Sequence, residues 1–440
     1  MNSNIINVIL IKKCYQKRDS YEGCGKYSVR FEKITYAWEQ RKLSELTTMH
    51  ARIGWQNLRT SEFLDSGDYM LITGTDFQEG VIDYSTCHYV EKERYDQDKN
   101  IQIKNGSILI TKDGTLGKVA YVQGLMMPAT LNAGVFNVTI KNENIMDGKY
   151  LFQYLKAPFL MDYVSKKATG GTIKHLNQSI LVDFPVAMPK REEQVKISRY
   201  FTALDNLITL HQRKCDETKQ LKKFMLQKMF PKNGEKNPEI RFEGFTDDWE
   251  QRKLSEICER ITRKNRNNES DLPLTIASQF GLIDQRDFFN KVVAAKDMSN
   301  YYLLKKGEFA YNKSYSNGFD YGSIKRLNAY KQGCLSTLYI CFGITSDEVE
   351  SDYLECFFDT LKWYGDLSMI CAEGARNHGL LNVDTKGFFD EVTVDLPKSL
   401  EEQKRISVYM NALNRLITLH QRKCEKLKEL KKYMLHNMFV

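Results

Sequence analysis

Mostly apolar residues recur at alternating spacings of four and three in two stretches of the chain. The first set is Ile197, Phe201, Leu204, Ile208, His211, Cys215, Thr218, Lys222, Met225 and Met229, and the second is Ile406, Met410, Leu413, Ile417, His420, Cys424, Leu427, Lys431, Met434 and Met438. A heptad seam with polar interruptions predicts long helices that pack against each other. We expect the packing to rest on Ile197, Phe201, Leu204, Ile208, Ile406, Met410, Leu413 and Ile417.

Prolines delimit these two helices. Pro189 and Pro397 lie just upstream, where a helix can begin, and Pro231 follows the first stretch. A helix of roughly 39 residues is about 58 Å long, too long to be explained by local stability alone. The Lys and Arg residues outside the seam are expected to form a solvated face, and we include Lys222 and Lys431 among them despite their place in the heptad frame.

The remaining sequence alternates short β-rich runs with turn signals. Strands are predicted at 107–111, 119–122, 135–140, 308–312 and 337–342, and helical pieces at 148–166 and 350–370. Gly114 to Val119 lacks the spacing of a phosphate loop and predicts a hairpin turn instead. These runs predict two mixed α/β segments, one before each long helix.

The chain is an internal duplication. WEQRKLSE occurs at 38–45 and again at 249–256, and EEQVKISRYFTALDNLITLHQRKC at 192–215 matches EEQKRISVYMNALNRLITLHQRKC at 401–424. Isolated identical residues occur in the same order between these blocks: Lys104, Gly106 and Lys112 match Lys305, Gly307 and Lys313, and Leu176-Asn177 matches Leu381-Asn382. A period of about 210 residues indicates a domain duplication rather than a solenoid. Trp38 and Trp249 are expected to anchor each globular segment on its helix.

Charge distinguishes the helices from the globular segments. The net charge is +8, yet residues 189–230 hold ten basic and five acidic side chains, and residues 397–440 hold ten and four. The helices are therefore basic and the remainder is slightly acidic. The ten cysteines have no zinc-like spacing and favour reduced, buried thiols, and no run is long enough to cross a membrane, so we expect a cytoplasmic protein.

No catalytic motif is recognisable. The chain has no GxGxxG at a helix start, no HExxH, no GxSxG and no Asn-Pro-Pro-aromatic motif of amino-methyltransferases. His211 and His420 are more economically explained as packed seam residues than as metal ligands. We therefore expect a binding protein without a cofactor or a bound metal.

Three motifs together resemble the specificity subunit of type I restriction-modification systems. They are WEQRKL at the head of each globular segment, Gly171-Thr-Ile-Lys-His-Leu-Asn177, and the EEQ motif that opens each long helix. The resemblance implies an α+β fold with two target recognition domains, at 30–189 and 241–396, each reading one half of a split DNA site. It also implies two antiparallel coiled-coil spacer helices, at 190–230 and 397–440, in a pseudo-twofold arrangement. Residues 1–29 stay unassigned and 231–240 form a linker.

The same resemblance implies the partners. They are double-stranded DNA, two methyltransferase subunits bound by the helices, and restriction/translocase subunits that join through the methyltransferases. Methylation and cleavage are then performed by those partners, and this chain is not an enzyme.

Polar loop clusters are the candidate DNA contacts, since Arg, Lys and Asn side chains can donate to phosphates and base edges. The candidates are Lys112, Asp113, Thr115, Thr172, Lys174, His175 and Asn177 in the first domain, and Lys313, Ser314, Tyr315, Ser316, Asn317, Arg376, Asn377 and His378 in the second. Lys112 and Lys313 are alternatively turn residues, and Asn177 and Asn382 alternatively helix caps.

Two other functions remain open. A coiled-coil scaffold without DNA specificity explains the helices but not two large diverged segments. A nuclease or methyltransferase in its own right requires a motif that the sequence does not display.

Overall fold

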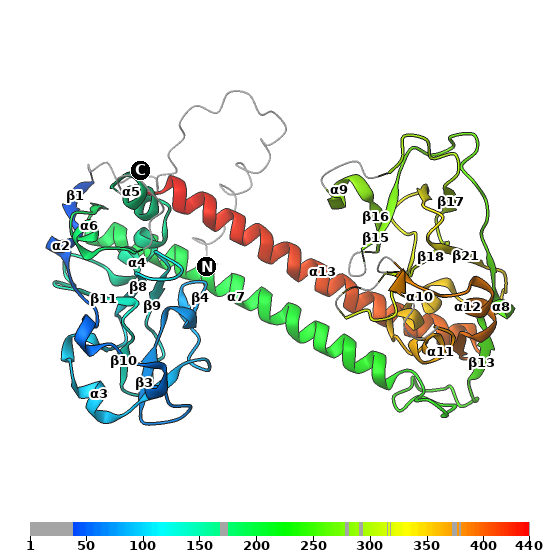
Figure 1. Ribbon diagram of the computed structural model, residues 1–440, viewed down its shortest axis with the longest axis horizontal. Helices are drawn as coiled ribbons and strands as arrows, with labels where there is room; N and C mark the ends of the chain where they lie inside the picture. Colours follow the sequence, from blue (N-terminus) through cyan, green and yellow to red (C-terminus); the bar gives the residue numbers. More distant parts are fainter. Residues whose placement is uncertain are drawn as a thin grey trace. The chain divides into compact units, whose positions relative to one another are not determined.

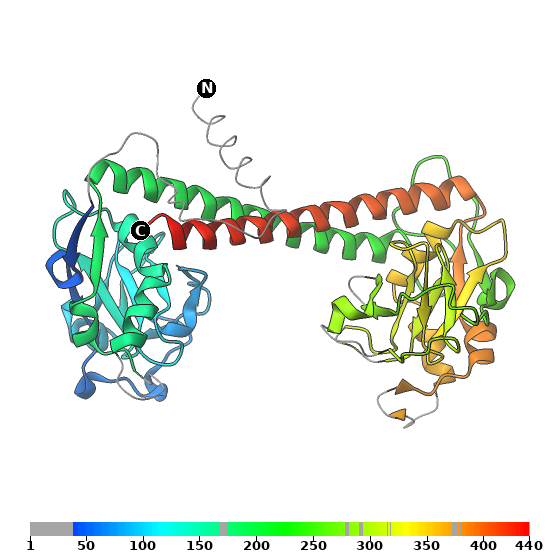
Figure 2. The same ribbon diagram turned by 90° about the horizontal axis from the view of Figure 1, so that it is seen from above.

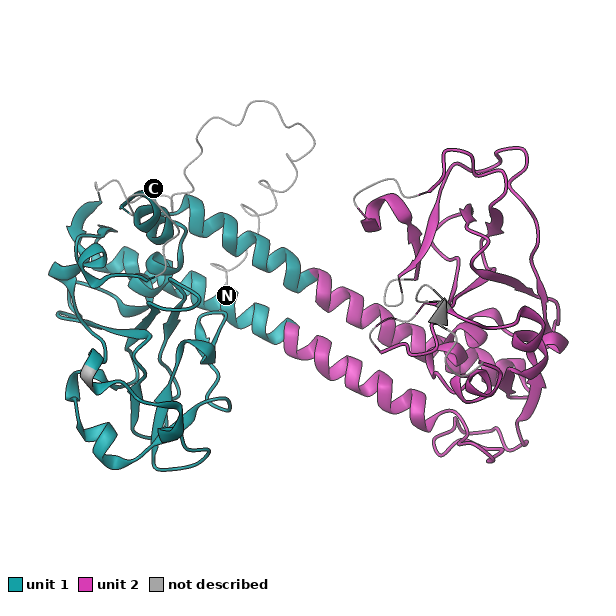
Figure 3. Ribbon diagram, in the orientation of Figure 1, with its two compact units in different colours: residues 1–211, 423–440 teal, residues 212–422 magenta. Residues whose placement is uncertain are grey.

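The computed structural model describes residues 38–167, 175–277, 281–289, 294–314, 316, 318–371, 376–377 and 380–439; the side chains of 55, 376, 377 and 380 are not described. The chain divides into two compact units. Unit 1 comprises residues 1–211 and 423–440, and unit 2 comprises residues 212–422 (Figure 3). The predicted N-terminal extension, 1–29, lies outside the described residues.

Unit 1 is built on two four-stranded sheets with short helices (Figure 1). Its strands are β1 (Glu39–Lys42), β2 (Thr47–His50), β3 (Tyr69–Ile72), β4 (Phe77–Gln78), β5 (Val81–Ile82), β6 (His88–Val90), β7 (Gln102–Ile103), β8 (Ile108–Thr111), β9 (Val119–Tyr121), β10 (Ala129–Leu131), β11 (Val135–Ile140) and β12 (Pro185–Met188). Its short helices are α2 (Leu43–Leu46), α3 (Lys92–Asp96), α4 (Gly148–Lys156), α5 (Phe159–Lys167) and α6 (Gln178–Val182), with 3-10 turns η1 (Gly54–Gln56), η2 (Thr60–Glu62), η3 (Gly74–Asp76) and η4 (Lys99–Ile101). The sheet orders are β2-β11-β8-β9 and β6-β3-β10-β7.

Unit 2 repeats part of this framework. Its strands are β13 (Glu250–Lys253), β14 (Cys258–Arg260), β15 (Leu274–Ala277), β16 (Gly281–Asp284), β17 (Tyr302–Lys305), β18 (Phe309–Asn312), β19 (Ser323–Arg326), β20 (Gln332–Leu335), β21 (Ile340–Ile344), β22 (Arg376–Asn377), β23 (Leu380–Leu381) and β24 (Thr393–Leu396). Its short helices are α8 (Leu254–Ile257), α9 (Gln285–Phe289), α10 (Ser351–Asp359), α11 (Tyr364–Ile370) and α12 (Thr385–Glu391). The sheet β14-β21-β18-β19 has the same order of corresponding strands as β2-β11-β8-β9.

The duplicated WEQRKLSE motif forms the same structure in both units. Residues 39–42 pair antiparallel with β12, with Glu39 opposite Met188, and residues 250–253 pair antiparallel with β24, with Glu250 opposite Leu396. The following Leu43 and Leu254 are fully buried at the start of α2 and α8. The motif therefore ties the start of each globular segment to the strand that precedes its long helix.

Two long helices, α7 (Arg191–Lys228) and α13 (Leu400–Asn437), follow the globular segments (Figure 1, Figure 2). Each has 38 residues, so each is about 57 Å long. The boundary between the units falls inside both helices, at His211 and at Arg422. Unit 1 therefore holds the start of α7 and the end of α13, and unit 2 holds the end of α7 and the start of α13.

The helix pairs run antiparallel within each unit. In unit 1 the ring centroids of Phe201 and Phe439 lie 5.7 Å apart, and Asp205, one turn further along α7, bonds to Lys431, which precedes Phe439. In unit 2 the Sγ of Cys215 lies 4.0 Å from the carbonyl oxygen of Ile417.

Each unit has a hydrophobic core that continues from its globular part into both helices. The core of unit 1 contains Ile197, Phe201 and Leu204 from α7 with Met434, Met438 and Phe439 from the end of α13. The core of unit 2 contains the corresponding residues Ile406, Met410 and Leu413 with Met229 and Phe230, and the partly buried Met225 packs against it. Phe439 packs edge-on against Tyr150 at 5.6 Å, and Phe230 stacks on Tyr353 at 5.7 Å. Each globular part is thus packed against its own helix and against the far end of the other.

The tryptophans lie beside these aromatic contacts. Trp249 is buried, lies 6.0 Å from Phe230 between ring centroids, and donates its indole N–H to Glu402 at 3.3 Å. Trp38 lies 6.4 Å from Tyr150 and is partly buried. Both positions agree with an anchoring role at the junction of a globular part and the long helices.

The glutamine of each EEQ motif fixes the start of a long helix. The Gln194 Oε1 accepts from the backbone N–H of Asp147 at 2.8 Å, and its Nε2 donates to the carbonyls of Ile145 and Pro189. Gln403 makes the same three bonds with Glu350, Glu348 and Pro397. Both amides are almost completely buried, so each is held in place by a fully used set of hydrogen bonds.

Three sequence predictions differ from the structure. The predicted helices at 148–166 and 350–370 are each two helices, because Pro158 has no N–H for the first and Leu361 adopts a positive φ of 61° in the second. The strand predicted at 337–342 begins only at Ile340. Lys222 and Lys431 are not solvated: both are largely buried and paired with carboxylates.

Candidate nucleic-acid interface

The loops that follow three strands of unit 1, β3, β8 and β10, meet the segment before α6 at one end of its sheets. The Asn132 N–H donates to the Ile72 carbonyl at 3.0 Å, which joins the loops after β10 and β3. The Lys112 N–H donates to the Gly134 carbonyl at 2.8 Å, and the Lys112 carbonyl accepts from the Leu176 N–H at 2.9 Å. Backbone hydrogen bonds therefore connect the loop after β8 to the loop after β10 on one side and to the segment before α6 on the other.

The side chains predicted from the first polar cluster lie on this connected set of loops. Lys112 is half-buried, with its Nζ 5.6 Å from the centre of the Phe136 ring. Asp113 and His175 form an exposed pair at 2.6 Å between Oδ1 and Nδ1. Thr115 is exposed at the tip of the β8–β9 hairpin, where Gly114 and Gly117 both adopt a φ of +71°. Residues 114–119 thus form the predicted hairpin turn.

The second polar cluster of unit 1 is only partly described. Thr172 and Lys174 lie outside the described residues. Asn177 is the N-cap residue of α6, although its side chain makes no capping hydrogen bond. His175 is therefore the described side chain that bridges the two clusters predicted from the sequence.

Unit 2 brings its two predicted clusters together through the same backbone bond. The Lys313 carbonyl accepts from the Leu381 N–H at 3.0 Å, just as the Lys112 carbonyl accepts from Leu176. The side chain of Asn312 accepts from the Ser314 N–H at 3.0 Å, and Ser316 pairs with Phe319. The sequence match of Lys112 with Lys313 is therefore also a structural match.

The rest of the predicted set in unit 2 is less fully described. Tyr315, Asn317 and His378 lie outside the described residues. Arg376 and Asn377 form β22, whose backbone pairs with β23, and their side chains are not described. Asn382 is not a helix cap, because Asp384 caps α12 by accepting from the Gly387 N–H at 2.9 Å.

Sequence reasoning missed the loops after β3 and β10. Residues 132–134 lie directly beside Lys112, and a Cβ on Gly74 would meet the Thr111 side chain at 2.9 Å. Turn-forming residues at Asn132 and Gly134 mark one loop, but its closeness to Lys112 depends on a strand order that no local pattern encodes.

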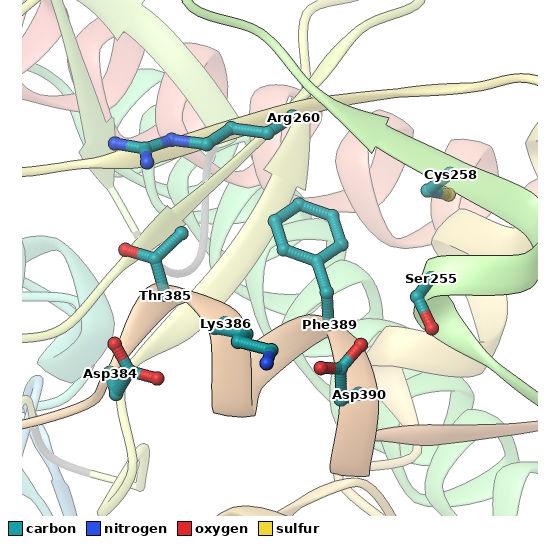
Figure 4. Close-up of a pocket in the computed structure, with 8 residues that line it drawn as sticks. All are labelled: Ser255, Cys258, Arg260, Asp384, Thr385, Lys386, Phe389 and Asp390. Carbon is teal, nitrogen blue, oxygen red and sulfur yellow. The ribbon is translucent and has the colours of Figure 1, made fainter.

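A surface pocket of unit 2 lies between α12 on one side and α8 with β14 on the other (Figure 4). It is lined by Ser255, Cys258, Arg260, Asp384, Thr385, Lys386, Phe389 and Asp390. Two basic and two acidic side chains share it, so its charge favours neither an anion nor a cation. The corresponding place in unit 1 is bridged by Gln178, whose Nε2 donates to the Met49 carbonyl at 3.0 Å.

Two buried thiols of unit 2 are unsuited to nucleophilic chemistry. Burial raises the pKa of Cys258 and of Cys341 to about 12, so both are protonated at neutral pH. Among the residues that the structure describes, no group of three or more His, Cys, Asp or Glu side chains could hold a metal ion. No described helix is long and apolar enough to cross a membrane.

The long helices carry a duplicated set of exposed apolar residues. Leu207 and Leu210 of α7 are 43% and 45% exposed in unit 1, and the matching Leu416 and Leu419 of α13 are 44% and 45% exposed in unit 2. Phe224 and Tyr433, which also match each other, are about half exposed. The predicted packing residues lie on another side of the helices: Ile197, Phe201, Leu204, Ile406, Met410 and Leu413 are buried, and Ile208 and Ile417 are half-buried.

Comparisons with known proteins agree with the motifs. Residues 36–220 match the family described as the type I restriction modification DNA specificity domain. The type I restriction enzyme MjaVIII specificity subunit of Methanocaldococcus jannaschii is 25% identical over 236 residues, which is 51% of this chain and 54% of that protein. The EcoR124I/EcoR124II specificity subunit of Escherichia coli is 26% identical over 151 residues, or 34% of this chain and 37% of that protein.

A solved structure shares the fold. The type I restriction-modification S subunit from M. genitalium superimposes with a TM-score of 0.60 over 94% of this chain and 99% of that one, at 15% identity. The matches to curated relatives span about half of those proteins or less. The resemblance seen in the sequence is confirmed: the chain carries a type I restriction-modification DNA specificity domain at residues 36–220 and is related to the specificity subunits of these systems.

Proposed function

We propose that the chain is the non-catalytic, sequence-specific DNA-binding subunit of a type I restriction-modification complex. The observation that carries this proposal is the repeated loop pair: Lys112–Leu176 in unit 1 and Lys313–Leu381 in unit 2 are joined by the same backbone bond on the same strand framework. The frameworks agree while the loop side chains differ. Two modules that read different base sequences require this combination of a shared scaffold and divergent side chains.

The proposed DNA contacts are the predicted loop side chains. In the first domain they are Lys112, Asp113, Thr115, Thr172, Lys174, His175 and Asn177, and in the second they are Lys313, Ser314, Tyr315, Ser316, Asn317, Arg376, Asn377 and His378. Lysine and arginine suit phosphates and guanine edges, and asparagine suits adenine edges. The exposed Asp113–His175 pair can accept from cytosine through its carboxylate or donate through its imidazole.

The domain boundaries belong to this proposal. The recognition domains are 30–189 and 241–396, the spacer helices are 190–230 and 397–440, and 231–240 is the linker. Helices of about 57 Å are longer than one DNA turn of about 34 Å, so an antiparallel coiled coil of α7 and α13 can set the gap between two half-sites. A scaffold without DNA specificity leaves the divergent loops unexplained.

The duplicated exposed leucines support two copies of one partner. Leu207 with Leu210 and Leu416 with Leu419 present the same apolar pair in each unit, beside the basic side chains of α7 and α13. Identical surfaces recruit identical partners. We assign them to two methyltransferase subunits, to which restriction/translocase subunits then bind.

A methylome test addresses DNA reading. Host cells with the gene intact or deleted, and with the cognate methyltransferase present in both, are sequenced by a single-molecule method that detects methylated adenine. The proposal predicts a split motif, methylated in both halves, that is present only with the intact gene. An identical set of methylated motifs in the two strains, with the methyltransferase shown to be expressed, would contradict it.

A docking test addresses the partner surface. Changing Leu207→Lys and Leu416→Lys together is expected to leave thermal unfolding of the chain unchanged, because both side chains are already exposed, and to abolish co-purification with the methyltransferase. Asn206→Arg is the matched control, since it copies the Arg415 already present at the equivalent position. Normal co-purification of the double leucine variant would refute this docking surface.

A further inference from the structure

Arg52 is a buried arginine that pairs with no carboxylate in the described part of the chain. It lies two residues after β2 and is 2% exposed. Its Nε donates to the Leu131 carbonyl at 2.9 Å, and NH1 donates to the Gln97 side chain at 3.1 Å and to the Gln56 carbonyl at 3.3 Å. NH2 lies 3.3 Å from the Thr130 Oγ1 and 3.5 Å from the Arg94 carbonyl. Neutral acceptors from three segments, η1, α3 with its C-cap and β10, thus surround one guanidinium.

A buried charge of this kind destabilises the fold unless hydrogen bonds compensate for its lost hydration. Burial lowers the pKa of Arg52 from its ordinary range and the nearby Arg94 lowers it further, against smaller opposing effects of Asp98 and Glu62, yet an arginine stays protonated in a protein. The side chain therefore retains a desolvated positive charge and depends on its hydrogen bonds to stay in place. Removing them leaves the Leu131 carbonyl and the Thr130 hydroxyl without this donor.

The acceptors of Arg52 lead directly to the candidate DNA contacts. Leu131 is the last residue of β10, and the next residue, Asn132, bonds to the Ile72 carbonyl. Gly134, two residues further on, accepts from the Lys112 N–H, and the Lys112 carbonyl accepts from Leu176. An arginine that fixes the end of β10 therefore fixes one side of the loop that carries Lys112 and Asp113.

Unit 2 offers a natural comparison. Arg263 occupies the equivalent position, 211 residues later, in register with the two WEQRKLSE motifs. It does not bind a neighbouring loop end; it pairs through NH2 with both oxygens of Glu308 at 2.7 and 2.8 Å, and it is 35% exposed. The two domains thus use an arginine at the same position in different ways.

We infer that Arg52 is a positioning residue for DNA reading by the first domain, acting through the loop at 131–134 on the backbone of Lys112 and Asp113. This inference rests on the proposed function. It assigns Arg52 no contact with DNA. Its consequence is that loss of the guanidinium relaxes base preference in one half-site and leaves the other half-site unaffected.

The test measures base discrimination rather than overall activity. The complete complex with its methyltransferase is assayed on the duplex identified by the methylome and on duplexes that each carry one substituted base pair. The kcat/KM ratio of the correct to the substituted duplex is independent of the fraction of folded complex. A residue with a purely structural role would change the amount of active complex and not these ratios.

Three variants and one control make the outcome decisive. Arg52→Gln is expected to lower discrimination at one or more positions of one half-site by roughly tenfold, equivalent to about 1.4 kcal/mol. Arg52→Lys keeps the charge and places its donors on a single nitrogen, and Thr130→Val removes one acceptor, so both are expected to produce smaller changes at the same positions, even if Arg52→Gln fails to fold. Arg263→Gln is expected to leave that half-site unchanged.

Two results would overturn the inference. The first is that the Arg52→Lys and Thr130→Val complexes both have the same kcat/KM ratios of correct to substituted duplex as the wild type. The other is an equal relaxation of the same half-site by Arg263→Gln. Either result leaves the proposed function intact, because the wild-type complex still reads its split motif; a wild-type complex without any split motif would instead reject the proposed function itself.

Discussion

Lys156 shows how a single side chain can be placed at an energetic disadvantage. It lies at the end of α4, where burial and the neighbouring ammonium of Lys431 lower its pKa to about 8, against a smaller opposing effect of Asp205. Its Nζ donates to the Glu79 carbonyl. The unfolded chain holds this proton up to about pH 10.5, so folding is penalised below pH 8 and the penalty disappears as the pH rises to about 10.5.

Replacing Lys156 with Met is therefore expected to stabilise the chain. The free energy of unfolding should rise by about 1–3 kcal/mol at pH 7, and the gain over the wild type should vanish near pH 10.5. Denaturant unfolding at pH 7, 9 and 10.5 measures this difference. A loss of stability at pH 7 would show that the hydrogen bond to Glu79 outweighs the burial of the charge.

At the candidate site, residue types were predictable and their neighbours were not. Lys112, Asp113 and His175 stand out in the sequence as polar residues at turn signals, but the pairing of Asp113 with His175 spans 62 positions. Arg52 carries no local motif at all. Its alignment with Arg263 was the available signal, and that signal does not reveal which acceptors surround the side chain.

Where each long helix meets its globular part, a largely buried lysine of that helix pair bonds to a carboxylate, and the carboxylate comes from a different element in each unit. In unit 1, Asp205 of α7 bonds to Lys431 at 2.5 Å and accepts from Gln153 at 3.0 Å. In unit 2, the residue that matches Asp205 is Asn414, and Lys222, the match of Lys431, bonds instead to Asp359 of α10 at 2.8 Å.

The position of Asp359 corresponds to Lys156 in unit 1, since both are the last residues of their helices. Burial alone would raise the pKa of Asp359, but Lys325 and Lys222 outweigh it and lower the pKa to about 2. The matching lysines Lys431 and Lys222 thus each keep a carboxylate partner, on the long helix in unit 1 and on the short helix in unit 2. The sequences of α7 and α13 alone do not reveal this exchange, because Asp359 belongs to α10.

A carboxylate at position 156 is expected to restore the stability that is lost when Asp205 is replaced. Asp205→Asn leaves Lys431 and Lys156 buried together without a carboxylate, and we expect a loss of about 3 kcal/mol in the free energy of unfolding. Adding Lys156→Asp recreates the arrangement of Asn414, Asp359 and Lys222 and is expected to recover most of that loss. Chemical denaturation of the wild type, the Asp205→Asn and Lys156→Asp single variants and the double variant measures the coupling.

Asp216→Asn is the matched control for this cycle, because Asp216 lies exposed on the same helix and should change stability by less than about 0.5 kcal/mol. If the double variant proves no more stable than Asp205→Asn alone, the carboxylate exchange has no energetic role.

The packing surface of the long helices has its own test. Leu204→Lys combined with Leu413→Lys places a charge in the buried core of each unit, so the chain is expected to lose its cooperative thermal unfolding and its assembly. The exposed Leu207 and Leu416, which receive the same substitution in the docking test, provide the comparison. Intact assembly of the Leu204 and Leu413 variant would contradict the packing described here.

At the scale of the whole molecule, the repeated parts were predictable and the divergent parts were not. Heptad spacing and prolines located α7 and α13 to within a few residues, because long periodic helices carry their signal locally. The interiors of the globular parts depend on pairings such as that of β10 with β3, which are set by contacts between distant segments. The mixed helix and strand content was confirmed, while strand order and the meeting of the loops came from the structure alone.

The central claim is that each globular domain reads one half of a split DNA site. Replacing residues 44–188 with the corresponding segment of another family member, and sequencing the methylome of cells that express the hybrid with the cognate methyltransferase, tests it most directly. The account predicts that one half of the methylated motif changes while the other half and the spacing between them are retained. A motif that stays the same in both halves, or that changes in both, would contradict it.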